Sequence, residues 1–325
     1  MNTSMSMPST KGMKVQRRDF LKYSAMGLGG LMMGSASWCA AAGEVGAGTS
    51  SGAAVAAGKS LDAFEKVPLG KTSVRMSRLI MGTGVQAWHR ESKQTRTGAG
   101  NFQALLRGAY DRGVRTFDMA DLYGSHQHVA KAMEGVPRDS YSLVSKIWWR
   151  EDGINEPERP DADVVVARFL KETKSDYLDL VLLHCVESPN WPRELRRQMD
   201  ILAGLKEKGI IRAHGVSCHS LPALEAAVGE PWVDSVHTRI NPYGTKMDGP
   251  PEKVAPVLQR LSKAGKGVVG MKLIGEGAFS KSEDKIDESI KYVTNLNCLS
   301  VYLVGIEKLA EIDDFAVRLK RVSRA

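Results

Sequence analysis

The sequence contains few cysteines. Only four occur in 325 residues, and their spacing is neither that of a zinc site nor that of a disulfide framework. Cys39 lies in the N-terminal segment, which leaves Cys185, Cys218 and Cys298, an odd number, for the rest of the chain. We therefore expect no zinc ribbon and no fold that depends on disulfide bonds.

A long hydrophobic run is also missing. The apolar segment at residues 23–37 is shorter than the roughly 20 residues of a membrane span and is diluted by glycine. It follows Arg17 and Arg18 and leads to small residues ending at Ala42, a pattern that resembles a twin-arginine export signal. We expect residues 1–42 to be a signal peptide that the twin-arginine translocation machinery recognises. The product would be exported, for example to the periplasm, without stable membrane association. An uncleaved anchor is the alternative.

Positive charge is not concentrated on the body of the chain. The formal net charge is +8, but five basic residues against Asp19 place +4 of it in residues 1–42, which leaves +4 for the remainder. Nucleic-acid binding requires basic residues clustered on one face. We therefore expect no nucleic-acid partner.

The chain after the signal alternates two kinds of segment. Residues 43–60 are rich in Gly, Ala and Ser and are expected to form a flexible linker, followed by a domain at residues 61–325. In that domain, eight short strand-like runs are separated by amphipathic, helix-like stretches. The runs cover residues 78–82, 114–118, 142–146, 178–184, 211–217, 233–241, 267–272 and 299–305. This alternation predicts an α/β fold with a parallel sheet, closed as a (β/α)8 TIM barrel. An open doubly wound sheet fits less well, because the usual Gly-rich phosphate turn is not clear.

Polar residues end six of the eight runs. They are Asp118, Lys146, His184, Ser217, Asn241 and Lys272. Parallel strands buried on both faces are normally apolar throughout, and the active sites of such barrels lie at the carboxyl ends of the strands. The pattern therefore predicts a shared polar pocket at that end.

Four residues near these ends suit carbonyl chemistry. Tyr123 is a weak acid with an ordinary pKa near 10, and we expect the ammonium of Lys146 to lower that pKa. Asp118 supplies a counter-charge for Lys146, and His184 can hydrogen-bond and orient a carbonyl oxygen. Such a site can polarise and protonate a carbonyl. It contains no hydride donor, so a redox reaction would need a cofactor.

Several motifs in these regions resemble those of one family. "RTFDMADLYG", the lysine of "LVSK", "SDYLDLVLLH" and "KEKGIIRAHGVS" look like successive signatures of the aldo-keto reductases, and "VPLGKTSVRMSRLIMGTG" is similar to that family's opening hairpin and first strand. The resemblance runs from about Lys66 to near the C-terminus. It implies an oxidoreductase that transfers hydride reversibly between a nicotinamide cofactor and a carbonyl or alcohol substrate, with sugars among the candidates. It further implies Tyr123 as general acid, tuned by Lys146 and Asp118, with His184 orienting the carbonyl.

The resemblance also implies where the cofactor would bind. Gly82 and Thr83 would lie near the nicotinamide, Ser217 near its carboxamide, and Lys272 and Gly275 near the pyrophosphate.

Three positions depart from the family pattern. Cys218 and His237 stand where the family usually has an asparagine and a glutamine that hold the carboxamide, and Glu307 stands where arginine is common. A carboxylate repels a 2′-phosphate, so NADP and NAD both remain open. The segment "MKLIGEG" resembles the branch that can carry iron-sulfur clusters, but no Cys-rich tail follows it, and we expect no cluster.

Two other functions compete with this interpretation. His126 and His128, with Asp121, His184 and His219, could form the site of a metal-dependent hydrolase, although H-x-H at this position is more typical of a helix start. Alternatively, the barrel could be a non-catalytic or regulatory ligand-binding protein that has kept the fold.

Overall fold

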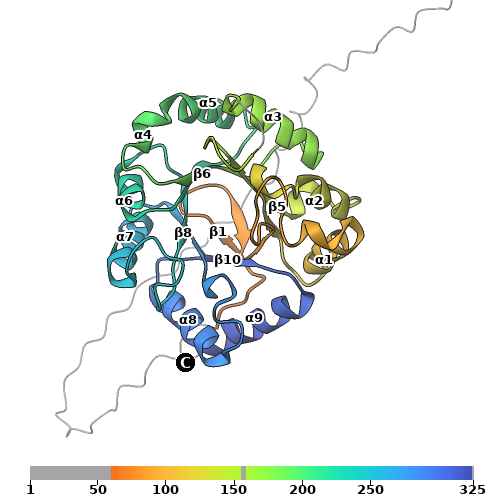
Figure 1. The fold of residues 1–325 in the computed structure, drawn as a ribbon, viewed down its shortest axis with the longest axis vertical. Coiled ribbons are helices and arrows are strands. Elements are labelled where there is room, and N and C mark those ends of the chain that lie inside the picture. Colours follow the sequence, from red (N-terminus) through yellow and green to blue (C-terminus); the bar gives the residue numbers. More distant parts are fainter. Residues whose placement is uncertain (1–59, 155–158, 324–325) are drawn as a thin grey trace, which may run out of the picture. The chain divides into compact units, whose positions relative to one another are not determined.

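The computed structural model describes residues 60–154 and 159–323, so the expected signal peptide and nearly all of the expected linker lie outside the described residues. Eight parallel strands close into a barrel in the order β10-β3-β4-β5-β6-β7-β8-β9 (Figure 1), which confirms the predicted fold class. The barrel strands are β3 (Leu79–Gly82), β4 (Thr116–Asp118), β5 (Ser142–Ile147), β6 (Leu180–Val186), β7 (His214–Cys218), β8 (Ser235–Arg239), β9 (Gly267–Met271) and β10 (Val301–Gly305). Each of the eight predicted runs overlaps one of them, although β5, β6 and β7 extend beyond the ends of their runs and β8 ends two residues before Asn241.

Helices surround the barrel in the described part of the chain (Figure 1). They are α1 (Ala99–Asp111), α2 (His126–Ala132), α3 (Ala162–Thr173), α4 (Trp191–Glu194), α5 (Arg196–Glu207), α6 (Leu221–Gly229), α7 (Pro251–Lys263), α8 (Glu283–Asn295) and α9 (Leu309–Val322). In α1, for example, Phe102, Leu106 and Ala109 are buried at the spacing of one helix face. Within residues 60–154 and 159–323, no helix combines the length and the apolar character needed to cross a membrane.

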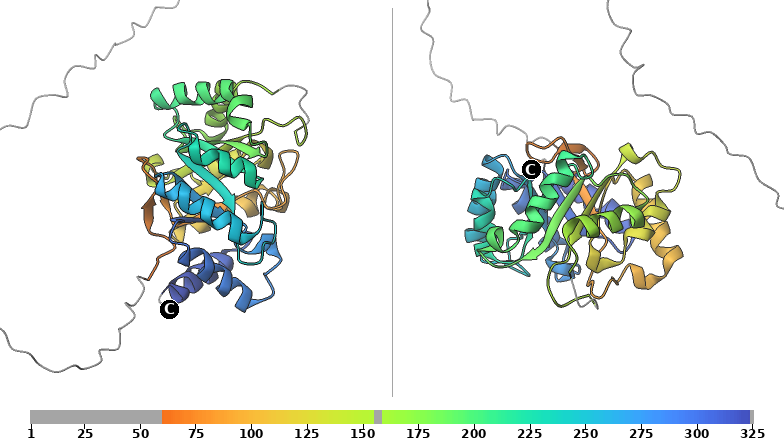
Figure 2. Two further views of the ribbon diagram at one scale, coloured as in Figure 1. Left: turned by 90° about the vertical axis from the view of Figure 1, so that its left-hand side faces the viewer. Right: turned by 90° about the horizontal axis from the view of Figure 1, so that it is seen from above.

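A hairpin closes one end of the barrel. Strands β1 (Lys66–Pro68) and β2 (Arg75–Ser77) pair antiparallel before the first barrel strand. Leu69 and Met76 of this hairpin are buried in the same apolar cluster as Ile80 and other residues from the barrel strands. Figure 2 shows the hairpin on one side of the barrel and the long loops that follow the strands on the other. We call the hairpin end the floor and the opposite, carboxyl end the mouth.

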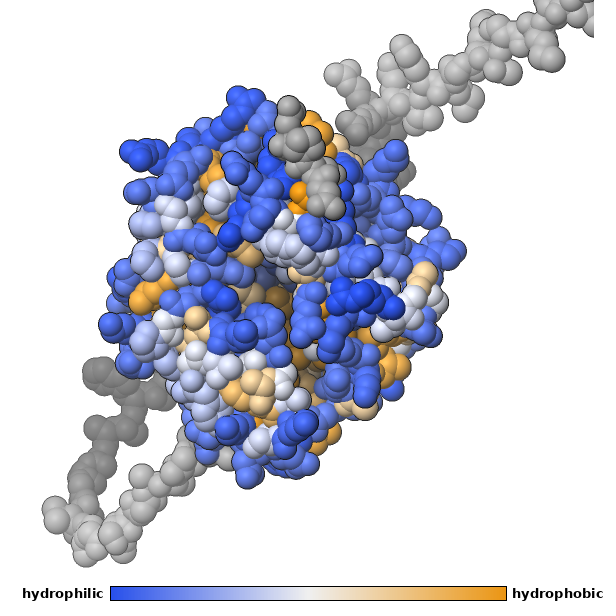
Figure 3. Space-filling view, in the orientation of Figure 1, coloured by the Kyte–Doolittle hydropathy of each residue, from blue (hydrophilic) through white to orange (hydrophobic). Residues whose placement is uncertain are grey.

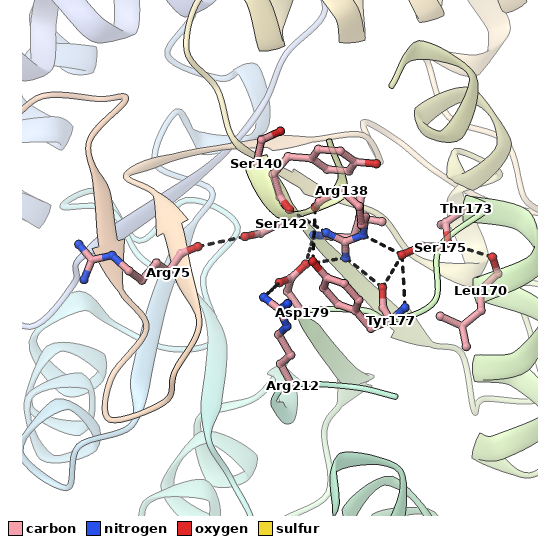
Figure 4. A network of polar contacts seen from close by, with 12 residues as sticks. Arg75, Arg138, Ser140, Ser142, Leu170, Thr173, Ser175, Tyr177, Asp179 and Arg212 are labelled. Carbon is pink, nitrogen blue, oxygen red and sulfur yellow. Dashed lines mark hydrogen bonds and ion pairs between the residues drawn. The ribbon is translucent and has the colours of Figure 1, made fainter. Parts of the chain in front are cut away.

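A polar network lies at the floor (Figure 4). Asp179, directly before β6, is 3% exposed and accepts hydrogen bonds from Arg138 (2.8 Å), Arg212 (3.2 Å) and the amide of Leu143 (2.8 Å). The guanidinium groups of both arginines lie 3.9 Å from the centre of the Tyr177 ring, within the range of cation–π attraction. These contacts join the starts of β5 and β6.

Candidate active site

Three neighbouring strands bring the predicted ionic pair together at the mouth. Asp118 ends β4, Lys146 lies near the end of β5, and His184 lies on β6. The Lys146 ammonium donates hydrogen bonds to Asp118 Oδ1 and, at 2.9 Å, to the carbonyl of Met119. Both charged side chains are almost completely buried. The predicted pairing of Asp118 with Lys146 is therefore confirmed.

Tyr123 joins this group from a short 3-10 turn, Asp121–Tyr123, that follows β4. Its hydroxyl lies 3.4 Å from His184 Nε2, and the two rings meet edge-on with centroids 5.6 Å apart. The Lys146 ammonium lies 4.8 Å from the centre of the tyrosine ring. On another side the ring packs directly on the backbone of Gly84, where an added Cβ would lie 2.5 Å from Tyr123 Cε2. All four residues predicted to be catalytic thus converge.

Burial controls the protonation of Tyr123 and His184. It raises the pKa of Tyr123 well above the ordinary value of 10, and the nearby carboxylate of Asp118 raises it further. The expected lowering of this pKa is therefore not found, because burial and Asp118 outweigh the attraction of the Lys146 ammonium, which lies 4.8 Å from the ring centre. Burial also lowers the pKa of His184 well below 6.5, and Lys146 adds to that shift. At neutral pH, Tyr123 is therefore a protonated donor and His184 is neutral.

Burial and mutual attraction together set the pKa values of Asp118 and Lys146, which lie beneath Tyr123 and His184. Burial acts to raise the pKa of Asp118, but Lys146 and then His237 outweigh it, so the pKa lies below 3.8. Burial lowers the pKa of Lys146, and Asp118 opposes that shift. Asp118 is consequently ionised at neutral pH.

Two residues expected near the carboxamide are fully buried. His237, on β8, has no exposed surface, and its Nε2 is 3.3 Å from Asp118 Oδ2. Cys218 is also fully buried and belongs to the main hydrophobic core, where burial raises the pKa of its thiol. In this structure neither side chain offers surface at the mouth for a cofactor to contact.

Other residues expected to bind the cofactor support the framework of the site. Gly82 and Thr83 are buried, and the Thr83 hydroxyl donates to the carbonyl of Asp118 at 2.7 Å. The hydroxyl of Ser217, 1% exposed, accepts a hydrogen bond of 3.0 Å from the amide of Cys185. These contacts fix the strand ends that carry Asp118 and His184.

The region expected to hold the pyrophosphate contains cations that already face a carboxylate. Lys272 directly follows β9, is 30% exposed, and donates to Glu276 Oε1 at 3.0 Å. The ammonium of Lys246 lies 3.9 Å from the other oxygen of Glu276. Gly275 lies between Lys272 and Glu276 in sequence, and its φ of 56° favours glycine. Two ammonium groups face one carboxylate here, so the region keeps a net positive charge that can attract a second anionic group.

Carboxylates dominate the start of α9. Glu307 forms an exposed ion pair of 3.3 Å with Lys93. Glu311 Oε2 accepts hydrogen bonds from the amides of Glu307 (2.7 Å) and Lys308 (3.2 Å). These two amides directly precede α9, so the carboxylate of Glu311 lies at the helix N-terminus, where phosphate groups commonly bind.

An apolar wall that was not predicted from the sequence stands beside the four converging residues, which we call the tetrad. A small cluster separate from the main core comprises Leu122, Trp148, Ile154 and Cys185, with Tyr123 packed against it. The Trp148 ring lies 5.2 Å from that of His184, and Trp88, 43% exposed, lies 6.0 Å from Trp148. The paired tryptophans that begin two residues after Lys146, in "KIWWR", were the available signal. Figure 3 shows a hollow near the centre of the mouth.

Two of the residues considered for a metal site, Asp121 and His126, have other partners. Asp121 is 5% exposed and binds Arg90 Nε at 3.0 Å and Arg168 at 2.7 Å, so it clamps the turn that carries Tyr123. His126 Nδ1 is 2.8 Å from a carboxylate oxygen of Glu172. Over residues 60–154 and 159–323, no group of three or more His, Cys, Asp or Glu side chains is arranged to hold a metal ion. The arrangement therefore does not favour the hydrolase alternative.

Comparisons with known proteins agree with this geometry. A model of the Aldo/keto reductase family matches residues 78–313, and the chain belongs to that family.

Curated relatives are distant. A methylglyoxal reductase, DkgB, from Salmonella typhimurium is 28% identical over 145 residues, which cover 43% of this chain and 52% of that protein. A D-threo-aldose 1-dehydrogenase from a Pseudomonas species is 23% identical over 215 residues, which cover 58% of this chain and 64% of that protein. The chain spans about half the length of the first of these relatives.

Solved structures match over more of the chain. An aldo-keto reductase from Pseudomonas aeruginosa has a TM-score of 0.65 at 22% identity and covers 81% of this chain and 97% of its own. The holo form of an aldo-keto reductase from Bacillus halodurans has a TM-score of 0.63 at 18% identity, over 79% of this chain and 91% of its own. At these identities the likeness concerns the fold.

Proposed function

We propose that the protein is a nicotinamide-dependent oxidoreductase that interconverts a carbonyl and an alcohol at the barrel mouth. The observation that carries this proposal is the placement of the Tyr123 hydroxyl beside His184 Nε2 and above the buried Asp118–Lys146 pair. When bound, the reduced nicotinamide supplies the hydride, and the protein supplies the proton and the charge stabilisation.

Tyr123 acts as the general acid. As the carbonyl carbon gains hydride, negative charge develops on its oxygen, and the protonated Tyr123 hydroxyl donates its proton there. The phenolate that remains lies near the ammonium of Lys146, which stabilises it electrostatically, and later regains a proton from solvent. The neutral His184 orients the same oxygen. In the oxidation direction the phenolate removes the hydroxyl proton of the alcohol.

We propose NAD as the preferred cofactor. Lys272 and Lys246, which face Glu276, would hold the pyrophosphate. At the start of α9, however, Glu307 and Glu311 place negative charge where a 2′-phosphate would be repelled.

We propose a small carbonyl compound or an aldose as the substrate. Trp88 and Trp148 present aromatic rings beside Tyr123 and His184, and such rings bury the apolar face of a ligand while its polar groups stay free to hydrogen-bond. The names of the relatives, a methylglyoxal reductase and an aldose dehydrogenase, fall in the same range.

Two measurements test the proposed activity. Fluorescence titration of protein freed of retained cofactor should show saturable binding of NADH, tighter than that of NADPH. Tyr123→Phe should reduce the turnover of methylglyoxal or an aldose by about 10²–10⁴-fold, with the Kd for NADH nearly unchanged. Tyr110→Phe, which removes a hydroxyl from α1 that contacts Ser140, is the matched control and should keep full turnover. Absence of binding to either cofactor would refute the proposal.

A non-catalytic ligand-binding barrel remains the second candidate. The observation that favours it is the burial of Ser217, Cys218 and His237, which leaves few of the expected cofactor contacts accessible. Saturable binding of a carbonyl compound or sugar without any cofactor dependence would support it.

We also propose that residues 1–42 direct export through the twin-arginine machinery. The paired Arg17 and Arg18 before a glycine-diluted apolar segment support this proposal. Mass spectrometry of the exported protein should find Gly43 at the N-terminus. Replacing both arginines with lysine should abolish export, and processing unaffected by that change would refute the proposed route.

A further inference from the structure

We propose that His237 is a positioning residue that holds Asp118 from the side opposite Lys146 and so keeps Lys146 in place beneath Tyr123. This inference rests on the proposed function, and it gives His237 a role different from the carboxamide contact expected at its position.

The contact spans the barrel. Asp118 ends β4 and His237 lies on β8, and in the closed order of eight strands β4 and β8 are four positions apart, on opposite sides. Side chains from two opposite strands can meet only if both point into the barrel. His237 Nε2 lies 3.3 Å from Asp118 Oδ2, while Lys146 occupies Oδ1. The carboxylate is therefore held between an ammonium and an imidazole.

Burial makes this contact significant. His237 has no exposed surface, and neither of its ring nitrogens forms a hydrogen bond of good geometry within the described residues. Asp118 Oδ2 also lacks one, so the attraction at 3.3 Å is electrostatic and not a well-aligned hydrogen bond. A polar ring buried without partners is costly. The carboxylate of Asp118 provides the compensation.

The charged groups around His237 determine how it affects the protonation of Asp118. Asp118 and Lys146 are the charged groups that act on it, and neutral His184 is also nearby. Burial lowers the pKa of His237 and Asp118 opposes that shift, while His237 in turn helps to lower the pKa of Asp118. Without His237, Asp118 would hold a proton up to a higher pH. At the acid end of the pH range Lys146 would then lose its anion sooner, and the ammonium beneath Tyr123 would no longer be held in place.

The experiment compares three variants. His237→Leu removes every polar atom of the ring, and His237→Gln keeps an N–H donor of similar reach. Thr238→Val is the matched control, because Thr238 is the next residue on the same strand, is equally buried, and has a hydroxyl without a hydrogen-bond partner. Successive residues of a strand point to opposite faces, so this control leaves the contact with Asp118 intact.

We expect His237→Leu to lower kcat by about 10-fold or more and to move the acid limb of the pH–rate profile to higher pH, with the Kd for NADH nearly unchanged. His237→Gln should restore most of kcat, and Thr238→Val should behave like the wild type. An unchanged kcat and acid limb in His237→Leu would overturn the inference. So would weaker NADH binding at unchanged kcat, since that result indicates a carboxamide contact.

A readout without turnover separates this inference from the proposed function. NMR titration of carbon-13-labelled aspartate carboxyls, with the Asp118 signal assigned from Asp118→Asn, gives the pKa of Asp118 directly. His237→Leu should raise that pKa, whether or not the wild type proves to be an oxidoreductase. An unchanged pKa would refute the role of His237 even in an active enzyme.

Discussion

Replacing Gly84 with alanine would push directly on the ring of Tyr123. An ideal Cβ at Gly84 lies 2.5 Å from Tyr123 Cε2, whereas ordinary contact begins at 3.4 Å, so the ring must move by about 0.9 Å. The backbone of Gly84 does not have a positive φ, and alanine is therefore tolerated conformationally. His184 stands against another edge of the same ring, which limits where the ring can go.

A displacement of this size has a calculable effect. Misplacing a catalytic group by about 1 Å costs up to about 10²-fold in rate, equivalent to about 2.7 kcal/mol of transition-state stabilisation. We expect kcat/KM for methylglyoxal at saturating NADH to fall by about that factor in Gly84→Ala. The Kd for NADH should change little. Urea unfolding should show a loss of about 1–3 kcal/mol from overpacking.

Gly204→Ala is the matched control. Gly204 lies within α5, and an added Cβ there meets nothing within 4 Å. Alanine at this helical site should stabilise the protein by roughly 0.5–1 kcal/mol and leave activity unchanged. If Gly84→Ala kept kcat/KM within threefold of wild type, the position of the Tyr123 ring would not limit the reaction, and the assignment of Tyr123 as general acid would lose its geometric support.

Three further predictions concern other parts of the molecule. Glu307→Arg should shift the ratio of NADPH to NADH affinity by about tenfold or more toward NADPH, because attraction replaces repulsion of a phosphate; fluorescence titration against Glu307→Gln measures this, and an unchanged ratio would place α9 outside the cofactor site. Asp179→Asn should lower the free energy of unfolding by about 2–3 kcal/mol at unchanged kcat, less than for a fully buried pair because Arg212 is 44% exposed; urea unfolding measures the loss. Burial lowers the pKa of His214 from 6.5 to about 4, so between pH 6.5 and 4 the unfolded chain binds a proton that the native protein excludes, and stability should fall as the pH drops through that window. His214→Gln should flatten that part of the stability profile, and an equally steep profile in the variant would contradict the assignment.

The barrel was predictable because alternation of strands and helices has few stable solutions. The ends of the strands could be located closely enough to identify Asp118, Lys146 and His184 as neighbours, since β4, β5 and β6 are consecutive in both sequence and space. Tyr123 followed from its position a few residues beyond β4. Local pattern and connectivity together were sufficient for these residues.

Contacts across the barrel or between loops were not predictable in the same way. The contact of His237 with Asp118 depends on two strands on opposite sides, and no local pattern encodes that distance. Asp121 was considered as a metal ligand, yet in the structure it pairs with Arg90 and Arg168 from distant segments. The contact of Gly84, two residues after β3, with the ring of Tyr123 likewise joins two separate loops. The pKa of Tyr123 was predicted in the wrong direction, because the sequence shows neither how deeply the phenol is buried nor that Asp118 lies close enough to raise its pKa.

The network around Asp179 has a consequence for how this chain can change over generations. It stabilises the floor, while the tetrad and the tryptophans lie at the other end of the same strands. A substitution at the mouth that alters selectivity at a cost of about 1–2 kcal/mol can be compensated by an independent improvement at the floor, since distant sites contribute additively. The barrel can therefore acquire new substrates and recover its stability through separate mutations, in either order.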